Sequence, residues 1–352
     1  MTAPAAPARA ERGWGKLVFA LLAFVVVPTI PQFRALLPVE HTMALFVPAL
    51  AACFVVGWWA GGRLWMAAVF VAAAVYLALQ PAQLPSVFAN LQRGWSLLVA
   101  GAFGLVCLFG VRRPLFPRAL VALGIAIVLA VVMSGLGPVK GPAVEHAVSV
   151  ELARRNAETM NTLNTFIGQY PDDWNTLVRK VPRLDSLPAE TQKQLGLMAT
   201  AGAGLYPSLL LLESLMALAL AWATYHRLGR ARLGPPLAPL KEFRFNDQLV
   251  WGLIVGLTIV FLPTLSTFAM VGRNLLVFFG ALYAIRGLGV LAFFLAPGVL
   301  GVAAAVGFVM LWAPYLNVVA VLGFLSLALA AFGLGLGDTW ADWRSRARPT
   351  PS

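Results

Sequence analysis

Two ionisable residues stand inside long apolar stretches of this sequence, where a charged side chain is most costly. Glu213 and Arg286 each lie near the middle of such a stretch. Placing a charged group at the centre of a bilayer costs about 2.5–3.5 kcal/mol, so each of them suggests a functional position. Their similar depth and opposite charge predict either a buried ion pair or a site for a polar solute. Asn274 and Tyr283, in the same stretch as Arg286, are candidates to line that site.

No pattern of catalytic or metal-binding residues accompanies this pair. The sequence contains no Gly-x-Ser-x-Gly, no His-Glu-x-x-His and no Gly-rich phosphate loop. Its three histidines, His41, His146 and His226, fall in loops or at the ends of apolar stretches, where a solvated imidazole is the default. Both cysteines lie inside apolar stretches and are expected to act as small hydrophobic residues. We therefore expect neither an enzyme, nor a metal site, nor a cofactor.

The elements that must position these residues are membrane-spanning helices. Of the 352 residues, 60% are hydrophobic and 11% are charged, whereas soluble domains carry about 25% charged residues. A helix crosses the hydrocarbon core with about 20 apolar residues. Ten stretches meet this description approximately: 16–37, 41–62, 64–81, 95–111, 117–138, 202–226, 248–270, 274–296, 298–314 and 316–337. The prediction is an all-α, polytopic transmembrane helical bundle of about ten spans, within a range of about eight to ten.

Residues 287–337 contain no charge, so proline has to mark the turns there. Pro297 and Pro314 interrupt this run, and because proline removes a helix hydrogen bond, we expect them to separate three helices.

The segment 140–200 has a different character, with equal numbers of acidic and basic residues and no apolar run long enough to span. Apolar residues recur in it at helical spacing, which predicts amphipathic helices. The expected organisation is therefore a five-span bundle at 1–139, an extracytoplasmic amphipathic helical insertion at 140–200, and a five-span bundle at 201–352 that ends in a short basic cytoplasmic tail.

Basic residues predict the orientation, because short loops rich in Lys and Arg stay in the cytoplasm. With the N-terminus inside, most of these residues fall in cytoplasmic segments, and only Arg34, Arg93 and Arg273 fall in the opposite short loops. We expect a multipass protein of the bacterial cytoplasmic (inner) membrane with both termini in the cytoplasm. The net charge of +12 is then a matter of topology, so we expect the lipid bilayer as partner and no nucleic acid.

Part of the second half is similar to a known family. The stretch Phe243-Arg-Phe-Asn-Asp-Gln-Leu-Val-Trp251, the motif Asn274-Leu-Leu-Val, and Leu282-Tyr-Ala-Ile-Arg-Gly-Leu288 carry the likeness, which covers roughly residues 200–330. They resemble the YybS-like family of uncharacterised bacterial multipass membrane proteins. That family is grouped with the substrate-binding components of energy-coupling-factor transporters, so the resemblance implies a role in uptake of a small solute.

Two hypotheses follow. The first is a transporter-like or small-solute-binding membrane protein with a midplane polar site at Glu213 and Arg286. The alternative is a scaffold that transports nothing and binds a membrane or cytoplasmic protein partner, through the 140–200 segment or through the basic loop at 227–244. A polar cavity of roughly 300 Å³ or more that reaches Arg286 would favour binding.

Overall fold

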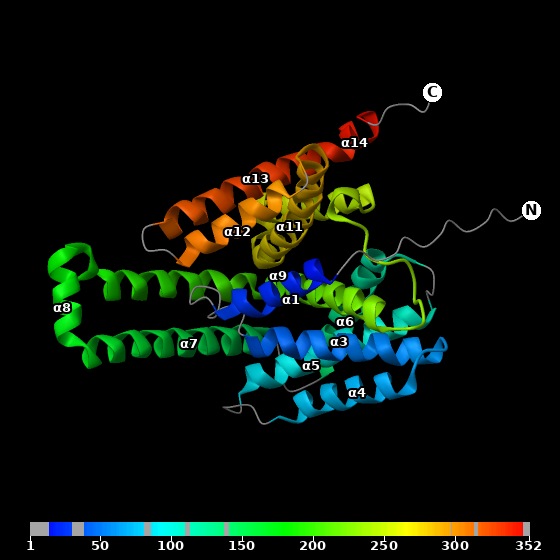
Figure 1. Ribbon diagram of the computed structural model, residues 1–352, viewed down its shortest axis with the longest axis horizontal. Coiled ribbons are helices and arrows are strands. Elements are labelled where there is room, and N and C mark those ends of the chain that lie inside the picture. Colours follow the sequence, from blue (N-terminus) through cyan, green and yellow to red (C-terminus); the bar gives the residue numbers. More distant parts are fainter. Residues whose placement is uncertain are drawn as a thin grey trace, which may run out of the picture. The chain divides into compact units, whose positions relative to one another are not determined.

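The fold is helical throughout the part of the chain that the computed structural model describes, namely residues 14–29, 39–80, 86–109, 113–136, 141–296, 298–312 and 316–347. The α-helices, drawn in Figure 1, are α1 (Gly15–Val26), α3 (Val39–Trp59), α4 (Leu64–Leu79), α5 (Val87–Phe109), α6 (Leu115–Leu136), α7 (Gly141–Gln169), α8 (Pro171–Lys180), α9 (Leu187–Leu228), α10 (Val250–Phe261), α11 (Ala269–Phe294), α12 (Val299–Trp312), α13 (Leu316–Ala341) and α14 (Trp343–Arg346). The predicted all-α class is confirmed.

Among the described residues, six helical stretches are long and apolar enough to cross a membrane: Glu40–Trp59, Val87–Phe109, Leu115–Gly135, Ala199–Leu228, Pro263–Phe294 and Val319–Ala341. Four shorter apolar helices occupy Gly15–Thr29, Leu64–Leu79, Asp247–Phe261 and Val299–Met310. Each of the ten expected stretches overlaps one of these helices. The shorter ones fall below the ~20 residues of a straight crossing, so the total of ten spans stays a prediction.

Large apolar side chains cover the outer faces of these helices. Phe109 is 89% exposed, and Leu79 and Phe261 are each 77% exposed. Water would not tolerate so many exposed apolar groups in a monomer, but lipid solvates them. The two prolines expected to divide the uncharged run, Pro297 and Pro314, lie outside the described residues. The chain does leave the helical conformation between α11 and α12, where Gly298 has a φ of 98°.

The chain forms two compact units, Met1–Leu237 and Ala238–Ser352. In the first unit α3 packs against α4, α5 and α9, and α6 packs against α5 and α9. The core between them combines small residues with aromatic rings, such as Ala119 beside Phe103 and Trp222. Small residues let helices approach closely, which is the main source of packing energy between helices in lipid. The boundary expected at residue 200 falls inside α9, and this helix packs with the N-terminal helices because its apolar face completes their core.

Helix α9 is too long for a single crossing. It has 42 residues, which corresponds to about 63 Å at 1.5 Å per residue, twice the ~30 Å of the hydrocarbon core. Its first part runs beside α7, and α8 connects the two at their far end (Figure 1). The Asn156 side-chain amide of α7 donates to the Leu195 carbonyl of α9 at 2.8 Å. The helices expected within 140–200 are thus present, and the last of them continues without a break into a span.

In the second unit, α11 packs against α10 and α13, and α12 packs against α13. The crossing of α11 and α13 depends on two glycines. A Cβ atom at Gly287 would overlap the carbonyl oxygen of Ala331, and one at Gly335 would overlap that of Tyr283. Both neighbours are backbone atoms, which cannot move aside as a side-chain end can.

We expect Gly287→Ala to destabilise this unit by about 1–3 kcal/mol or more, which is the cost of overpacking a core. The reason is that the added methyl group forces α11 and α13 apart. Gly280→Ala on the same helix is the matched control, since a Cβ there meets nothing within 4 Å; it should stabilise the helix by about 0.5–1 kcal/mol. Thermal unfolding of both variants in detergent measures the difference. Equal melting temperatures would contradict the close contact.

Candidate functional site

Glu213 lies on α9 in the interior of the first unit, where it is 5% exposed. An ionisable neighbour is the imidazole of His41, on the first turn of α3, whose Nδ1 is 3.7 Å from the Glu213 carboxylate oxygen Oε2. His41 is itself 1% exposed. A buried acid and a buried base therefore lie side by side, at a separation longer than a hydrogen bond.

Aromatic rings and one hydroxyl surround this pair. The His41 ring stacks on Phe88 of α5 with centroids 5.5 Å apart, and Tyr206 of α9 lies 6.4 Å from His41. Next to Glu213 along the chain, the Ser214 hydroxyl accepts a 3.0 Å hydrogen bond from the indole N–H of Trp95 and donates to the carbonyl of Leu210. Ser214 is thus engaged with Trp95 and with the backbone of its own helix.

The acid–base pair itself finds no hydrogen-bond partner in the part of the chain that the structure describes. Both carboxylate oxygens of Glu213 and both ring nitrogens of His41 are buried and unsatisfied among the described residues. Each unsatisfied buried group costs about 1–3 kcal/mol, and more when it is charged. Most buried polar groups in folded proteins are satisfied, so four such atoms in one place need an explanation. A proton, or the polar groups of a bound solute, would satisfy them.

Charged residues of α7 lie next to the aromatic rings that surround His41. The Arg155 guanidinium lies 5.1 Å over the Phe88 ring, and its Nε donates to Glu151 at 2.9 Å. Arg154 also donates to Glu151, at 2.7 Å and 3.0 Å. Burial alone would raise the pKa of Glu151, but the hydrogen bonds and positive charges of the two arginines prevail and lower it. Glu151 therefore stays ionised and holds both guanidinium groups in place.

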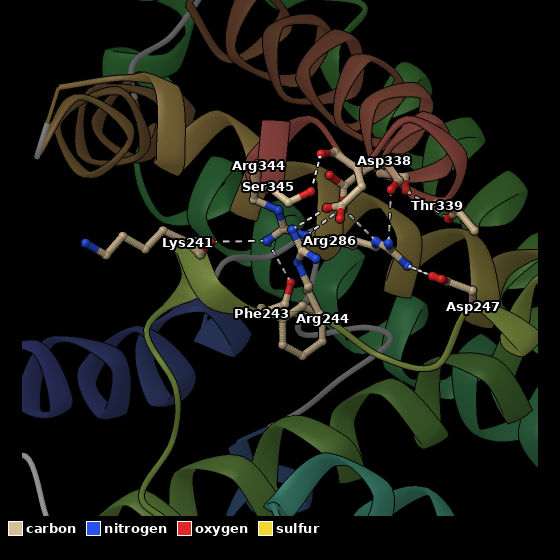
Figure 2. A network of polar contacts seen from close by, with 11 residues as sticks. Lys241, Phe243, Arg244, Asp247, Arg286, Asp338, Thr339, Arg344 and Ser345 are labelled. Carbon is tan, nitrogen blue, oxygen red and sulfur yellow. Dashed lines mark hydrogen bonds and ion pairs between the residues drawn. The ribbon is translucent and has the colours of Figure 1, made fainter. Parts of the chain in front are cut away.

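Arg286 has different partners from the one that the sequence suggested. Its Nε donates to the Asp338 carboxylate at 3.0 Å, and its Nη1 donates to Asp247 at 2.6 Å, both within the second unit (Figure 2). Within the second unit two aspartates neutralise Arg286, and within the first unit His41 is the neighbour of Glu213, whereas the ion pair expected between Glu213 and Arg286 would join the two units and stays a prediction. Helix packing, which the sequence does not reveal, decides the contacts within each unit.

Arg286 belongs to a network at helix ends. It lies about two turns before the end of α11, Asp338 lies in the last turn of α13, and the Asp247 side chain is 59% exposed. Arg286 lies in the C-terminal half of the candidate span Pro263–Phe294, and its position at the midplane stays a prediction. Arg344 of α14 donates to the same Asp338 oxygen at 2.6 Å and to the backbone carbonyls of Lys241 and Phe243. Figure 2 shows both arginines converging on Asp338.

This network connects the ends of α11, α13 and α14 to the segment before α10. The Arg286 guanidinium also lies 5.3 Å from the centre of the Phe245 ring, which packs edge-on against Tyr283. Two arginines and two aspartates balance in charge, so the cluster fixes the packing of helix ends with its charges compensated. We assign it a structural role.

The two other candidate residues belong to α11. Tyr283 is fully buried next to the Arg286 network and contacts Phe245. Asn274 lies about three turns before Arg286. Its side-chain amide donates to the Met270 carbonyl of its own helix at 2.9 Å. Both residues thus contact neighbouring protein groups and not a cavity that the structure describes.

A cleft of about 730 Å³ lies between α7 and the first part of α9. Its lining includes Glu145, Asn156, Gln192 and Ala203, and does not include Arg286. The cavity expected for solute binding would reach Arg286. The described cleft instead lies mostly outside the candidate spans, with Ala199, Thr200 and Ala203 at the start of the span Ala199–Leu228.

The solvated imidazole expected at His41 is wrong, because this side chain is 1% exposed, and Asp338, Asp247 and Arg344 were not predicted as site residues. His41 begins an apolar stretch, and nothing in the sequence shows whether such a residue turns inward or toward water. Asp338 follows the uncharged run at 287–337, and this position fits the end of a span as well as it fits a buried site. The only hint in the sequence was the order of the charges. Asp338 is the first charge after this uncharged run, and Arg286 is the last one before it.

Asp338→Asn should destabilise the protein strongly, by about 3–5 kcal/mol, because it leaves two buried guanidinium groups without their carboxylate. The matched control is Asp342→Asn. Asp342 pairs with Arg244 at 2.6 Å but is 46% exposed, and its loss should cost less than about 1 kcal/mol. Thermal unfolding in detergent compares the two. A similar small effect of both changes would show that Asp338 is not the centre of the network.

Comparison with known proteins agrees with a membrane protein. A family model described as "Predicted membrane protein (DUF2232)" matches residues 33–327. Searches of curated proteins and of solved structures found no match. The matched region covers most of the 352 residues and takes in helices of both units, including the helices that carry His41, Glu213 and Arg286. On this evidence the chain belongs to the DUF2232 family of predicted membrane proteins.

Proposed function

We propose that this protein is a transporter-like membrane protein that binds a small solute, and that Glu213 and His41 form its polar site. The observation that carries the proposal is the burial of an acid and a base, 3.7 Å apart, with all four of their N and O atoms unsatisfied. Ionisable groups inside spans commonly mark substrate or proton pathways. A scaffold has no need of such a pair.

The chemistry of the pair suits reversible binding. A carboxyl group and an imidazole at this distance can share one proton, held on either partner. The carboxylate can also accept hydrogen bonds from a solute, while the imidazole offers a donor on one nitrogen and an acceptor on the other. Because lipid and protein surround the site, each hydrogen bond made there is stronger than in water. Arg286, whose charge is compensated by aspartates, is not part of the proposed site.

The resemblance to the YybS-like family, and through it to substrate-binding components of energy-coupling-factor transporters, supports the same proposal. The distribution of Lys and Arg supports the bacterial inner membrane as location, with both termini in the cytoplasm. Exposed Arg230 and Arg232 fit the cytoplasmic side of this topology. We propose no catalytic role.

The second candidate is a scaffold that binds a protein partner through the α7–α8–α9 hairpin or the basic loop at 227–244. One observation favours it: the loop is held in a fixed conformation. The indole N–H of Trp222 donates to the Pro235 carbonyl at 3.1 Å, Tyr225 donates to that of Ala231 at 2.8 Å, and Arg118 to that of Leu233 at 2.9 Å. A fixed loop presents its arginines in a constant arrangement. The loop does not account for the buried pair.

If Glu213 is kept for function, removing its charge should stabilise the fold. We expect Glu213→Met, similar in volume, to raise the free energy of unfolding by about 1–3 kcal/mol, because two unsatisfied oxygens disappear. Ser214→Ala, the neighbouring control, should lower it by about 0.5–1.5 kcal/mol through loss of the Trp95 hydrogen bond. Thermal unfolding in detergent measures both. A large loss of stability in Glu213→Met would mean that the pair is structural.

Solute binding is tested by thermal shift on the full-length protein in detergent, with a panel of vitamins, nucleobases and small amines. A solute at about 100 times its Kd stabilises the folded state by about 2.7 kcal/mol. We expect such a shift in the wild type and a reduced one in Glu213→Gln and His41→Gln. Thr258→Val serves as control, because its exposed hydroxyl bonds back to its own helix. Absence of any shift in the wild type, or equal shifts in all variants, refutes the proposed site.

A further inference from the structure

The cleft between α7 and α9 has the size and the chemistry of a small-molecule site. Its volume of about 730 Å³ falls within the ~300–1,000 Å³ of typical ligand pockets. Side-chain amides and hydroxyls line it, from Ser149, Asn156 and Asn161 on α7 and from Gln192 and Thr200 on α9. Alanines and a methionine fill the spaces between them. This mixture of hydrogen-bonding groups on an apolar floor suits a small polar molecule.

The charge of the residues that line the cleft indicates which class of molecule would bind there. Among the described residues that line the cleft, the only ionisable one is Glu145, and no lysine or arginine belongs to the lining. The nearby arginines of α7 are engaged elsewhere: Arg154 pairs with Glu151 and Glu158, and Arg155 with Glu151. A single carboxylate without a compensating cation attracts a positively charged group and repels an anion.

Helix α9 joins this cleft to the buried acid–base pair. Gln192, Gly196, Ala199 and Ala203 line the cleft, and the series continues at the same alternating steps of four and three residues. Its next members are Tyr206, Leu210 and Glu213. Steps of three and four residues keep side chains on one face of a helix. The cleft floor and Glu213 thus lie on one continuous face of α9.

Two features mark the passage between them. Pro207 sits inside α9 and has no N–H to donate, so the Ala203 carbonyl on the cleft floor lacks its usual helical partner. One helical step further, Tyr206 packs against Phe88 with ring centroids 5.5 Å apart, and both rings lie near His41. An acceptor carbonyl, the aromatic pair of Tyr206 and Phe88, and the Glu213 carboxylate thus follow one another along this part of the unit, and the Arg155 guanidinium lies over the Phe88 ring.

We infer that the α7–α9 cleft binds a small organic cation, an amine that also carries hydroxyl or amide groups, with Glu145 as its charge partner. This deepens the proposed function, because it names the solute that Glu213 and His41 would receive. Asn161 and Gln192, both exposed on the cleft walls, supply hydrogen bonds to the polar part of the molecule.

The test uses matched probes on the full-length protein in lipid nanodiscs, with isothermal titration at pH 7. The amines are glucosamine and ethanolamine. Their neutral counterparts are glucose and ethylene glycol, and their anionic ones are glucuronate and glycolate. We expect at least one amine to bind at least tenfold more tightly than its neutral and anionic counterparts. Binding of no amine at millimolar concentration, or equal binding within a matched set, overturns the inference.

Variants locate the site. Glu145→Gln should weaken amine binding at least tenfold, and Ala157→Trp, at an exposed position of the lining, should abolish it by filling the cleft. Glu158→Gln on the same helix is the control, because Glu158 pairs with Arg154 and does not line the cleft. Unchanged affinity in Glu145→Gln and Ala157→Trp would overturn the assignment.

Glu213→Gln separates this inference from the proposed function. If the cleft variants weaken binding and Glu213→Gln does not, the cleft site stands and the role proposed for Glu213 falls. If only Glu213→Gln weakens binding, the membrane site stands and the cleft inference falls. Weakening by all three supports one route from cleft to carboxylate.

Discussion

Lipid offers no hydrogen bonds, and the structure of this protein depends on that constraint. Every backbone group inside the bilayer has to be satisfied within its own segment, which makes each apolar stretch a helix. Ionisable side chains obey the same constraint: they need a partner, a place at the interface, or a function. The two units of this chain resolve it in different ways.

In the second unit, buried charges are compensated. Asp338 receives Arg286 and Arg344, and Asp247 approaches Arg286 from the other side. These residues lie at helix ends, so the network connects α14 and the segment before α10 to the helices without placing an isolated charge in the hydrocarbon. Close packing at Gly287 and Gly335 brings α11 and α13 near enough for Arg286 to reach Asp338. Backbone contact and ion pairing thus support each other.

In the first unit, Glu213 and His41 are buried without such compensation, although hydrogen-bonded groups surround them. Helix α9 connects this pair to the α7–α8–α9 hairpin, because the same continuous helix lines the cleft with its first half and carries Glu213 in its second. The hairpin is therefore part of the same architecture as the span and not an independent insertion.

The sequence by itself determined the class of the molecule. Long uncharged stretches predicted helices in lipid, the balanced charges of 140–200 predicted a segment outside the spans, and the isolated charges at 213 and 286 marked positions of interest. These features depend on composition and spacing along one helix. The tertiary structure decided which charges meet: Arg286 pairs with Asp338 and Asp247, and His41 lies beside Glu213. Such pairings depend on the rotation and crossing of helices far apart in the chain, which close contacts such as Gly287 with Ala331 fix in space and hydropathy along the chain does not encode.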